Sequence, residues 1–413
     1  MTTRARPFRL AIVASHAVQY QAPLFRRLAR CPAIDLTVLF CSNFGAEPYF
    51  DRGFERPIQW DRPLLDGYRS QMLWNGSPRP DVSRFWGVVN PEVVRVLRNG
   101  RFDAVWLNGW SRASYWLAMA ACIASGIPVL MRGETNLLAP VPPWKRLAKK
   151  GVLGTLFRWV QGFLAIGSAN RDFYRAHGVD DNRIFLTPYA VDNDFFLSRA
   201  RELARRRDEL RRNLGLSEAP IVMFCGKLGH VKAPGDLLEG FARVRRNGER
   251  AILLFVGDGP LRGALENRVQ ELGVDGVVFA GFKNQEELPS LYAAADVLVV
   301  PSLSEAWGLV VNEAMCFGLP VIVSDRVGAA VDLVREGENG FIFPVGDIDR
   351  LAEDLSSVLR DSDLRRRLGQ RSREKIRRWS YEEDVSGLLE CLESIAVDGR
   401  LPSSAAERER QAR

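Results

Sequence analysis

Histidine and cysteine are scarce in this chain of 413 residues, which contains three of the first and six of the second. The cysteines are scattered, with no Cys-x-x-Cys pair and no spacing typical of metal ligands. This scarcity excludes a zinc-finger or disulfide-scaffold protein and favours a reduced, cytoplasmic one. A Gly-x4-Gly-Lys-Ser/Thr loop is also missing, which argues against an ATPase.

The sequence also lacks an apolar run long enough to cross a membrane. The stretch from Ala113 to Met131 carries no charge, but the Ser-Gly-Ile-Pro sequence at 125–128 divides it into an Ala-rich helix and a buried strand. The apolar run at 10–15 follows several arginines, yet it is too short for a signal peptide and predicts a first strand instead. We therefore expect no transmembrane helix.

Neither sign of charge dominates, since 57 Lys and Arg stand against 50 Asp and Glu, for a formal net charge of +7. The small basic surplus favours anionic partners such as phosphorylated metabolites or lipid headgroups. Nucleic acid is not expected, because no zinc-finger, RRM or basic-leucine-zipper pattern occurs. The hydrophobic and charged fractions, 46% and 26%, are typical of a soluble globular protein and exclude a collagen-like repeat or a coiled coil.

Apolar runs of strand length alternate with helical patterns along most of the chain. The runs are continuously hydrophobic, as strands buried on both faces of a parallel sheet must be. We expect strands over 9–15, 36–41, 104–107, 128–131, 163–166, 184–187, 221–225, 251–256, 277–279, 297–300 and 321–324. Helices fall between them, for example over 91–98, 113–125 and 169–177, whereas 43–91 is predicted to be a long loop with short strands.

These repeated strand–helix units predict an α/β protein with two Rossmann-like, doubly wound parallel-sheet domains that face a cleft. We place the domains at 1–192 and 218–378, with a linker over 193–217. A C-terminal helix over 379–397 is expected to cross back to the first domain. The tail at 398–413 is predicted to be disordered.

The most informative motif is PSLSEAWGLVVNEAM at 301–315, which follows a buried strand and opens a helix. The backbone N–H groups of Gly308, Leu309 and Val310 would then be unpaired donors at a helix start, which is a site for a phosphate. Glu305 and Glu313 flank this point. Carboxylates repel phosphate but accept hydrogen bonds from sugar hydroxyls, although an acid here also fits a simple interaction with the helix dipole.

A second motif, FCGKLGHVKAP at 224–234, places two lysines after another strand. Lys227 and Lys232 would reach a diphosphate at the same sheet edge. The alternative is a pair of solvated surface lysines.

Together these stretches resemble the family 4 retaining glycosyltransferases of the GT-B fold, or glycosyl transferases group 1. The resemblance covers about 221 to 355 and is carried by GKLGHVKAPGDLLEGF, FVGDGPLRGALE, VVFAGFKNQEELPSLYAAADVLVVPSLSEAWGLVVNEAMCFGLPVIVSD and NGFIFPVGDIDRLAEDL. Its most specific element is the Glu-x7-Glu pair formed by Glu305 and Glu313. The resemblance implies the GT-B fold, a nucleotide-sugar donor in the C-terminal domain, with UDP- and GDP-sugars favoured, and no other cofactor.

The resemblance also implies roles for individual residues. Lys227 and Lys232 would hold the diphosphate, and Glu305 would contact hydroxyls of the donor sugar. Glu313 would contact the ribose. The loop around Phe282 and Lys283 would contact the nucleobase, largely through backbone atoms.

The N-terminal half resembles the family less. Many relatives have a histidine after the strand that begins here at Pro128, and counting along places Glu134 at that position. Glu134 is expected to bind a sugar hydroxyl or to stabilise oxocarbenium charge, or else to form a structural pair with Arg132. His16 follows the first strand and is a candidate acceptor contact or proton carrier, or a structural histidine.

Two further patterns concern membranes and metals. The segment 144–160 is basic and amphipathic, which fits a helix lying on an anionic bilayer at the inner face of the cell membrane, or an ordinary helix that buries its aromatics. The Asp-x-Asp sequences at 192–194 and 347–349 do not close a clear buried strand, so no metal site is predicted.

The sequence thus predicts a retaining, metal-independent glycosyltransferase of the hexosyltransferase type. It would move a sugar from a nucleotide-diphosphate sugar to a sugar or lipid-linked acceptor in cell-surface polysaccharide or glycolipid assembly. The alternatives are a catalytically silent nucleotide-sugar-binding or scaffold protein and a nucleotide-sugar epimerase.

Overall fold

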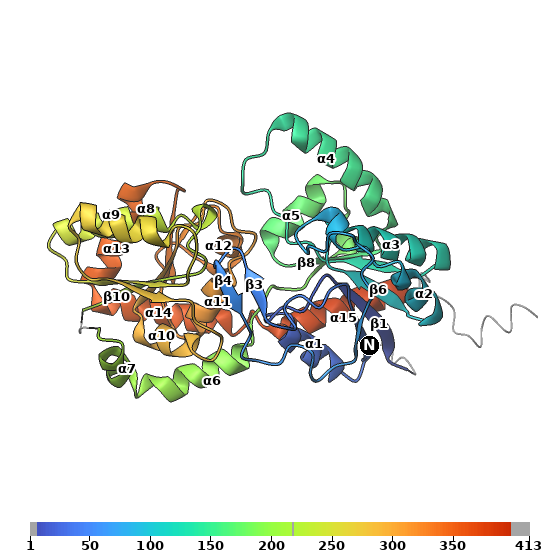
Figure 1. Ribbon diagram of the computed structural model, residues 1–413, viewed down its shortest axis with the longest axis horizontal. Helices are drawn as coiled ribbons and strands as arrows, with labels where there is room; N and C mark the ends of the chain where they lie inside the picture. The colour runs from blue at the N-terminus through green and yellow to red at the C-terminus, as the bar shows by residue number, and fades with distance from the viewer. Residues whose placement is uncertain (1–5, 217–218, 398–413) are drawn as a thin grey trace, which may run out of the picture.

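The computed structural model describes residues 6–216 and 219–397. The tail predicted at 398–413 lies outside this range, as do residues 1–5 and 217–218, and the side chains at 145, 146 and 148 are likewise not described. Two parallel sheets lie side by side, each covered by helices on both faces (Figure 1). The predicted α/β fold class is confirmed.

The first sheet has seven parallel strands in the order β5-β2-β1-β6-β7-β8-β9. Its strands are β1 Phe8–Ala14, β2 Ile34–Phe40, β5 Ser70–Met72, β6 Ala104–Leu107, β7 Val129–Met131, β8 Gly162–Ala165 and β9 Ile184–Leu186. Its helices are α1 Ala22–Ala29, α2 Glu92–Asn99, α3 Ala113–Ser125, α4 Pro143–Leu156 and α5 Ser168–Ala176. Side chains of α2, α3, α4 and α5 form the core on one face, and those of α1 form part of the core on the other.

The second sheet has six parallel strands in the order β12-β11-β10-β13-β14-β15. They are β10 Ile221–Cys225, β11 Ile252–Val256, β12 Val277–Gly281, β13 Val297–Val300, β14 Val321–Ser324 and β15 Gly340–Phe343. Its helices are α8 Pro234–Arg246, α9 Arg262–Leu272, α10 Leu288–Ala294, α11 Leu309–Cys316, α12 Gly328–Leu333, α13 Ile348–Arg360 and α14 Ser362–Ile376. The predicted strands of both sheets are confirmed with ends shifted by at most two residues. β15 was not predicted, and β5 lies in the segment 43–91, which was predicted only as a long loop with short strands.

Strand order sets the position of the ligand site in each sheet. In the second sheet the chain reverses its direction of winding between β10 and β13, which are neighbours. In the first sheet the same reversal separates β1 from β6. Ligands of open α/β sheets bind outside the carboxyl ends of the strands at such a reversal, because the loops on its two sides diverge there.

Two helices connect the sheets, α6 Asn193–Ala204 and α7 Arg207–Asn213, and a third, α15 Tyr381–Val397, packs against β8, β9 and α1 of the first sheet. Leu388, Leu392 and Ile395 of α15 are buried in the core that contains β1. The domain boundaries themselves stay a prediction.

The segment 43–91 contains a hairpin of β3 Tyr49–Asp51 and β4 Arg56–Ile58, then β5 and a 3-10 helix, η1 Phe85–Gly87. The hairpin belongs to the first half of the chain but lies between the two sheets (Figure 1). Its side chains therefore contact the second domain, as described below.

Candidate functional site

Helix α11 begins immediately beside the carboxyl end of β13. Gly308 precedes its first residue with a φ of 99°, a left-handed conformation that favours glycine. Among the described residues, no acceptor is bonded to the backbone N–H groups of Gly308, Leu309 and Val310. Three unpaired donors at the positive end of a helix dipole are an arrangement that favours an anion.

The loop after β10 meets this helix start. The Lys232 ammonium donates to Oε2 of Glu305, and the Ser302 hydroxyl lies 3.5 Å from the same oxygen. The backbone N–H of Leu303 donates to the carbonyl of Val231 over 2.8 Å, which joins the two loops directly. The chain thus brings Lys232 and Glu305 together although 73 residues separate them.

Glu313 lies one turn further along α11 and is partly buried. The Tyr292 hydroxyl donates to its Oε2 over 2.6 Å. Burial raises the pKa of Glu313 to about 7, against the lowering effect of that hydrogen bond. Burial also raises the pKa of the Cys225 thiol to about 12, and the Glu313 carboxylate adds to this while the Lys232 ammonium opposes it. Both charges therefore lie near the end of β10.

The second predicted lysine is held differently. Lys227 forms an ion pair with Asp51 of the hairpin, its Nζ lying 2.9 and 3.1 Å from the two carboxylate oxygens. Asp51 also accepts hydrogen bonds from the N–H groups of Gly53 (2.7 Å) and Phe54 (3.0 Å). The Lys227 ammonium lies 4.8 Å from the centre of the Phe54 ring. No local pattern pointed to Asp51, which is 176 residues away from Lys227.

The hairpin also covers Phe282. The ring of Phe54 meets it edge-on with centres 4.9 Å apart, Trp60 lies 6.3 Å away, and the Arg56 guanidinium stands 5.2 Å from its centre. Lys283, the other residue of this predicted loop, pairs with Glu287 over 3.0 Å. The side chain of Phe282 therefore packs against the first domain.

A cavity of about 440 Å³ lies at the carboxyl edge of the first sheet, beside β1 and β6. Its wall combines aromatic rings with amide, hydroxyl and charged groups, and includes His16, Tyr20, Gln21, Asn108, Trp110, Arg112, Tyr115, Arg132, Glu134 and Tyr189. Ala306 of the second domain completes the wall. Aromatic faces beside side-chain amides and carboxylates suit the apolar faces and hydroxyls of a sugar.

Asn136 connects this cavity to the loop of Glu305. Its side-chain amide donates to the backbone carbonyls of Glu305 (3.3 Å) and Ala306 (3.1 Å). Glu134 lies two residues earlier in the same turn. Glu134 of the first domain and Glu305 of the second therefore lie on the two sides of one seam, by which we mean the contact between the 134–136 loop and the 305–306 loop.

Glu134 is exposed to the cavity and is held by Tyr189, whose hydroxyl donates to Oε1 over 2.6 Å. The ring of Tyr20 packs edge-on against Tyr189, with centres 5.5 Å apart. Burial and the nearby Glu134 carboxylate raise the pKa of Tyr189 well above its usual value, so this tyrosine keeps its proton as a hydrogen-bond donor.

Arg132 does not pair with Glu134, and that alternative is wrong. Its guanidinium donates to Asp384 of α15 over 2.8 Å, and both side chains are almost fully buried. Arg132 also lies 5.3 Å from the ring centres of Trp106 and Tyr189. A buried arginine needs such a partner because an unpaired charge inside a protein is costly. Sequence reasoning missed Asp384, which is 252 residues away.

His16 lines the cavity, with its Nδ1 at 2.9 Å from the Ser15 hydroxyl. Burial, reinforced by the positive charge of Arg112, lowers the pKa of His16 to about 4. The ring is therefore neutral at neutral pH and is able to accept or donate a hydrogen bond there.

The two Asp-x-Asp sequences contribute helix caps. Asp192 accepts from the N–H of Phe195 (3.1 Å) and Asp347 from the N–H of Arg350 (2.9 Å). Within residues 6–216 and 219–397, no group of three or more His, Cys, Asp or Glu side chains is arranged to hold a metal ion.

Helix α4 has an apolar side that the fold does not cover. Leu147 and Val152 are 74% and 59% exposed, whereas Leu153 and Leu156 are buried in the core of the first sheet. The helix therefore combines a buried contact with an exposed apolar stripe. In the part of the chain that the structure describes, no helix is both long and apolar enough to span a bilayer.

The family model described as glycosyl transferases group 1 matches residues 206–375. A D-inositol 3-phosphate glycosyltransferase of Salinispora arenicola is 30% identical over 343 residues, 78% of this chain and 75% of that protein. Sulfoquinovosyl transferase SQD2 of Arabidopsis thaliana is 30% identical over 68% of this chain, which spans 54% of that longer relative.

Solved structures share the whole fold. Anabaena Alr3699/HepE in complex with UDP superposes with a TM-score of 0.70 at 18% identity, over 94% of this chain and 100% of that one. WaaG, a glycosyltransferase involved in lipopolysaccharide biosynthesis, gives 0.61 at 17% identity over 92% and 99%. Because a relative at 30% identity is matched over three quarters of its length, the chain belongs to the glycosyl transferases group 1 family and is a glycosyltransferase of the GT-B fold.

Proposed function

We propose that this protein transfers a sugar from a nucleotide-diphosphate sugar to an acceptor hydroxyl with retention of the anomeric configuration and without a metal ion. One observation carries the proposal. The Lys232–Glu305 pair lies beside the unpaired amides of α11, and Asn136 joins the Glu305 loop to the cavity that contains Glu134. A donor and an acceptor bound at these places would meet in the seam.

The donor half supplies groups for each part of a nucleotide sugar. The amides of Gly308, Leu309 and Val310 would bind the diphosphate together with Lys227 and Lys232. The Glu305 carboxylate would accept hydrogen bonds from the sugar and Glu313 from the ribose. Structures of HepE hold UDP and UDP-glucose, which supports a nucleotide-sugar donor here, with UDP- and GDP-sugars favoured.

In the reaction, the bond between the anomeric carbon and a diphosphate oxygen breaks, and the acceptor oxygen bonds to the same carbon from the same face. The negative charge that grows on the leaving diphosphate is stabilised by the α11 amides and the two lysines. These cations would supply the charge stabilisation that a metal ion provides in other transferases. The acceptor proton passes to the departing diphosphate, and the neutral ring of His16 would accept a hydrogen bond from the acceptor hydroxyl.

Glu134 would act on the acceptor side. Its carboxylate, oriented by Tyr189, would hold an acceptor or donor hydroxyl and stabilise the positive charge that develops at the anomeric carbon. The aromatic and amide wall of the 440 Å³ cavity would bind a sugar or the sugar part of a lipid-linked acceptor. The relatives' printed activities on inositol phosphate and sulfoquinovose, and in lipopolysaccharide synthesis, support a role in glycolipid or cell-surface polysaccharide assembly.

The exposed stripe of α4 supports contact with an anionic membrane surface, because the exposed basic residue Lys150 lies on the same helix as Leu147 and Val152. A second exposed basic residue, Arg158, follows directly in the 3-10 helix η2 Phe157–Trp159. Co-sedimentation with phosphatidylglycerol vesicles measures this contact. A Leu147→Ser, Val152→Ser variant is expected to lose most of the binding, and unchanged binding would remove α4 from the membrane-facing surface.

The decisive experiment is a thermal-shift screen with UDP-, GDP-, ADP- and TDP-sugars, followed by product analysis with extracted glycolipids. A donor that binds raises the melting temperature, and transfer to a lipid or saccharide with unchanged anomeric configuration supports the proposal. Donor binding without transfer to any acceptor favours a silent binding protein. Conversion of the nucleotide sugar in the absence of an acceptor favours an epimerase.

A further inference from the structure

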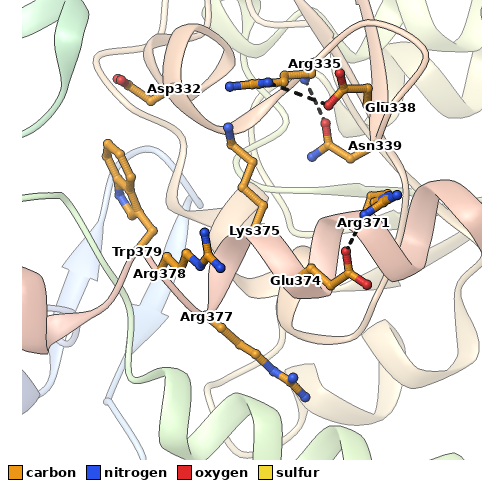
Figure 2. Close-up of a pocket in the computed structure, with 10 residues that line it drawn as sticks. All are labelled: Asp332, Arg335, Glu338, Asn339, Arg371, Glu374, Lys375, Arg377, Arg378 and Trp379. Atoms are coloured by element: carbon orange, nitrogen blue, oxygen red, sulfur yellow. Dashed lines mark hydrogen bonds and ion pairs between the residues drawn. The ribbon is translucent and has the colours of Figure 1, made fainter.

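A second cationic cavity lies in the C-terminal domain, where the chain passes from α14 to α15 (Figure 2). It has a volume of about 650 Å³ and shares no lining residue with the sites described above. Five of its ten lining side chains are basic and three are acidic, beside Asn339 and Trp379. None of the residues proposed for the transfer reaction lines this cavity.

The three carboxylates are already engaged. Asp332 accepts from the backbone N–H (2.8 Å) and hydroxyl (2.6 Å) of Ser168 across the domain boundary. Glu374 pairs with Arg371 over 2.9 Å, and Glu338 lies 3.9 Å from Arg335. Because five basic side chains stand against three carboxylates, the cavity keeps a surplus of two positive charges.

Three other cations have no such partner. Within the described residues, no carboxylate lies within ion-pair distance of Lys375, Arg377 or Arg378. In Figure 2 the Lys375 ammonium extends toward Arg335 and Asp332, whereas the Arg377 side chain points away from these three residues. Lys375 is partly buried. Burial and the charge of Arg335 lower its pKa, while the Asp332 and Glu338 carboxylates act more weakly in the opposite direction. A partly desolvated cation in a cluster with a net positive charge is stabilised when an anion binds beside it.

We propose that this cavity binds a phosphate group through Lys375, Arg378 and Arg335. The lysine supplies a compact point charge, and the planar guanidinium groups supply paired donors that match phosphate oxygens. The phosphate belongs to a soluble phosphate ester or to a lipid headgroup, since both present the same doubly or singly charged oxygens. Trp379 forms the remaining wall beside it.

The position of the cavity connects it to the reaction site. Trp379 stacks on Trp307 of the Glu305 loop, with ring centres 5.4 Å apart and planes 12° apart. Its indole N–H also donates to the carbonyl of Tyr189, the residue that holds Glu134. Asp332, on the opposite wall, fixes the start of α5 in the first domain. A bound phosphate would thus lie next to two contacts between the domains, that of Trp379 with Tyr189 and that of Asp332 with Ser168.

Calorimetric titration with inorganic phosphate tests the assignment. Phosphate also fits the α11 site, so the Lys227→Gln, Lys232→Gln variant is titrated in parallel. Two results together support the second site. Phosphate binding should persist in the Lys227→Gln, Lys232→Gln variant, and phosphate affinity should be at least tenfold weaker in the Lys375→Gln, Arg378→Gln variant than in wild type. Arg377→Gln removes a charge that points away from the group, and its phosphate affinity is expected to stay within twofold of wild type.

The proposal would be overturned if Arg377→Gln lost as much phosphate affinity as the double variant. The loss would then come from the lower overall positive charge and not from contacts with particular side chains. Equal binding by the double variant and wild type would overturn it as well. The single variant Arg378→Gln, at an exposed position, repeats the test with little risk to folding, and circular dichroism checks both proteins.

A final comparison separates the two sources of phosphate. Wild type and the double variant are sedimented with phosphatidylglycerol vesicles and with phosphatidylcholine vesicles. Weaker binding of the double variant to the anionic vesicles alone assigns a lipid headgroup. Unchanged vesicle binding with weakened titration by inorganic phosphate assigns a soluble phosphate ester. If neither binding is weakened, the cavity is not a phosphate site.

Discussion

Both sheets are parallel and reverse their direction of winding between two neighbouring strands, but their candidate sites are formed in different ways. In the second sheet, the site is a helix start and two loops, after β10 and β13, that touch each other. In the first sheet, the cavity collects side chains from the ends of β1, β6, β7 and β9. Backbone amides at a helix start suit any diphosphate, whereas a wall of individual side chains is selective for the shape and hydrogen-bonding groups of what it binds.

This difference teaches where each kind of specificity is encoded. The proposed donor site depends on a short continuous motif, so its substitutions should affect leaving-group chemistry directly. The proposed acceptor cavity depends on contacts between residues far apart in the chain, such as Arg132 with Asp384. The following predictions separate the two halves, from the largest expected effect to the smallest.

Replacing Lys232 by alanine should lower kcat/KM several hundredfold, or about 3.5 kcal/mol, because a positive charge next to the leaving diphosphate is lost. Steady-state kinetics measures it. Lys232→Arg should recover part of the activity. Arg268→Ala, which removes a surface cation paired with Glu239 and Glu271, serves as the control. Wild-type turnover in Lys232→Ala would remove this lysine from the mechanism.

Glu313 should make the protein less stable as the pH rises. Its pKa is about 7 in the folded chain and 4.5 ordinarily, so the folded state holds the proton more tightly. This contribution to the free energy of unfolding is fully present below pH 4.5. It is lost as the pH rises from 4.5 to 7, by as much as about 3 kcal/mol. Glu313→Gln should flatten this part of the pH profile.

Urea unfolding of wild type and Glu313→Gln at pH 5 and pH 8 measures this effect. Glu393→Gln, at an exposed position of α15, is the matched control and should leave the profile unchanged. Equal pH dependence in wild type and Glu313→Gln would show that another group is responsible. The same Glu313→Gln variant should bind the donor more weakly, because the ribose loses an ionisable acceptor.

Replacing Glu134 by glutamine should lower kcat about thirtyfold and leave the donor KM unchanged, because the carboxylate acts on the anomeric charge and not on the diphosphate. Tyr189→Phe keeps the carboxylate but removes its hydrogen bond, so its effect should be smaller. An increase in donor KM with constant kcat would place Glu134 in the donor site and break the division between the two halves.

Asp51→Asn should lower the donor KM about fivefold. The carboxylate would compete with the diphosphate for Lys227, and a partly exposed ion pair of this kind contributes about 1 kcal/mol. Asparagine keeps the oxygen that accepts from Gly53 and Phe54. Asp61→Asn makes the same charge change at the neighbouring contact with Glu286 and should have little effect. A higher KM in Asp51→Asn would show that Asp51 assists donor binding.

Local patterns predicted the strands well, because the core of a parallel sheet requires continuous apolar runs such as Val297–Val300. The edge strand β15 was missed. Its four residues, Gly340–Phe343, begin with glycine directly after an asparagine, and this combination is also typical of a turn. The hairpin at 49–58 has only partly buried strands, so it lacks the apolar signal.

The candidate site divides in the same way. Glu305, Gly308 and Glu313 stand in one motif whose spacing is set by a helix, and sequence alone placed them at one helix start. Asp51 and Asp384 pair with residues more than 170 positions away. No local pattern records such a pair, since the partners meet only after the sheets are assembled. Asn136 was within reach of sequence reasoning, because it follows Glu134 in the same turn.

The buried pair of Arg132 and Asp384 has a consequence for the order of folding. Helix α15 supplies both the counter-charge of Arg132 and part of the core over β8 and β9. During synthesis from the N-terminus, the first sheet must wait for the whole second domain before this helix emerges from the ribosome. The domain that is made first is therefore the one that is finished last.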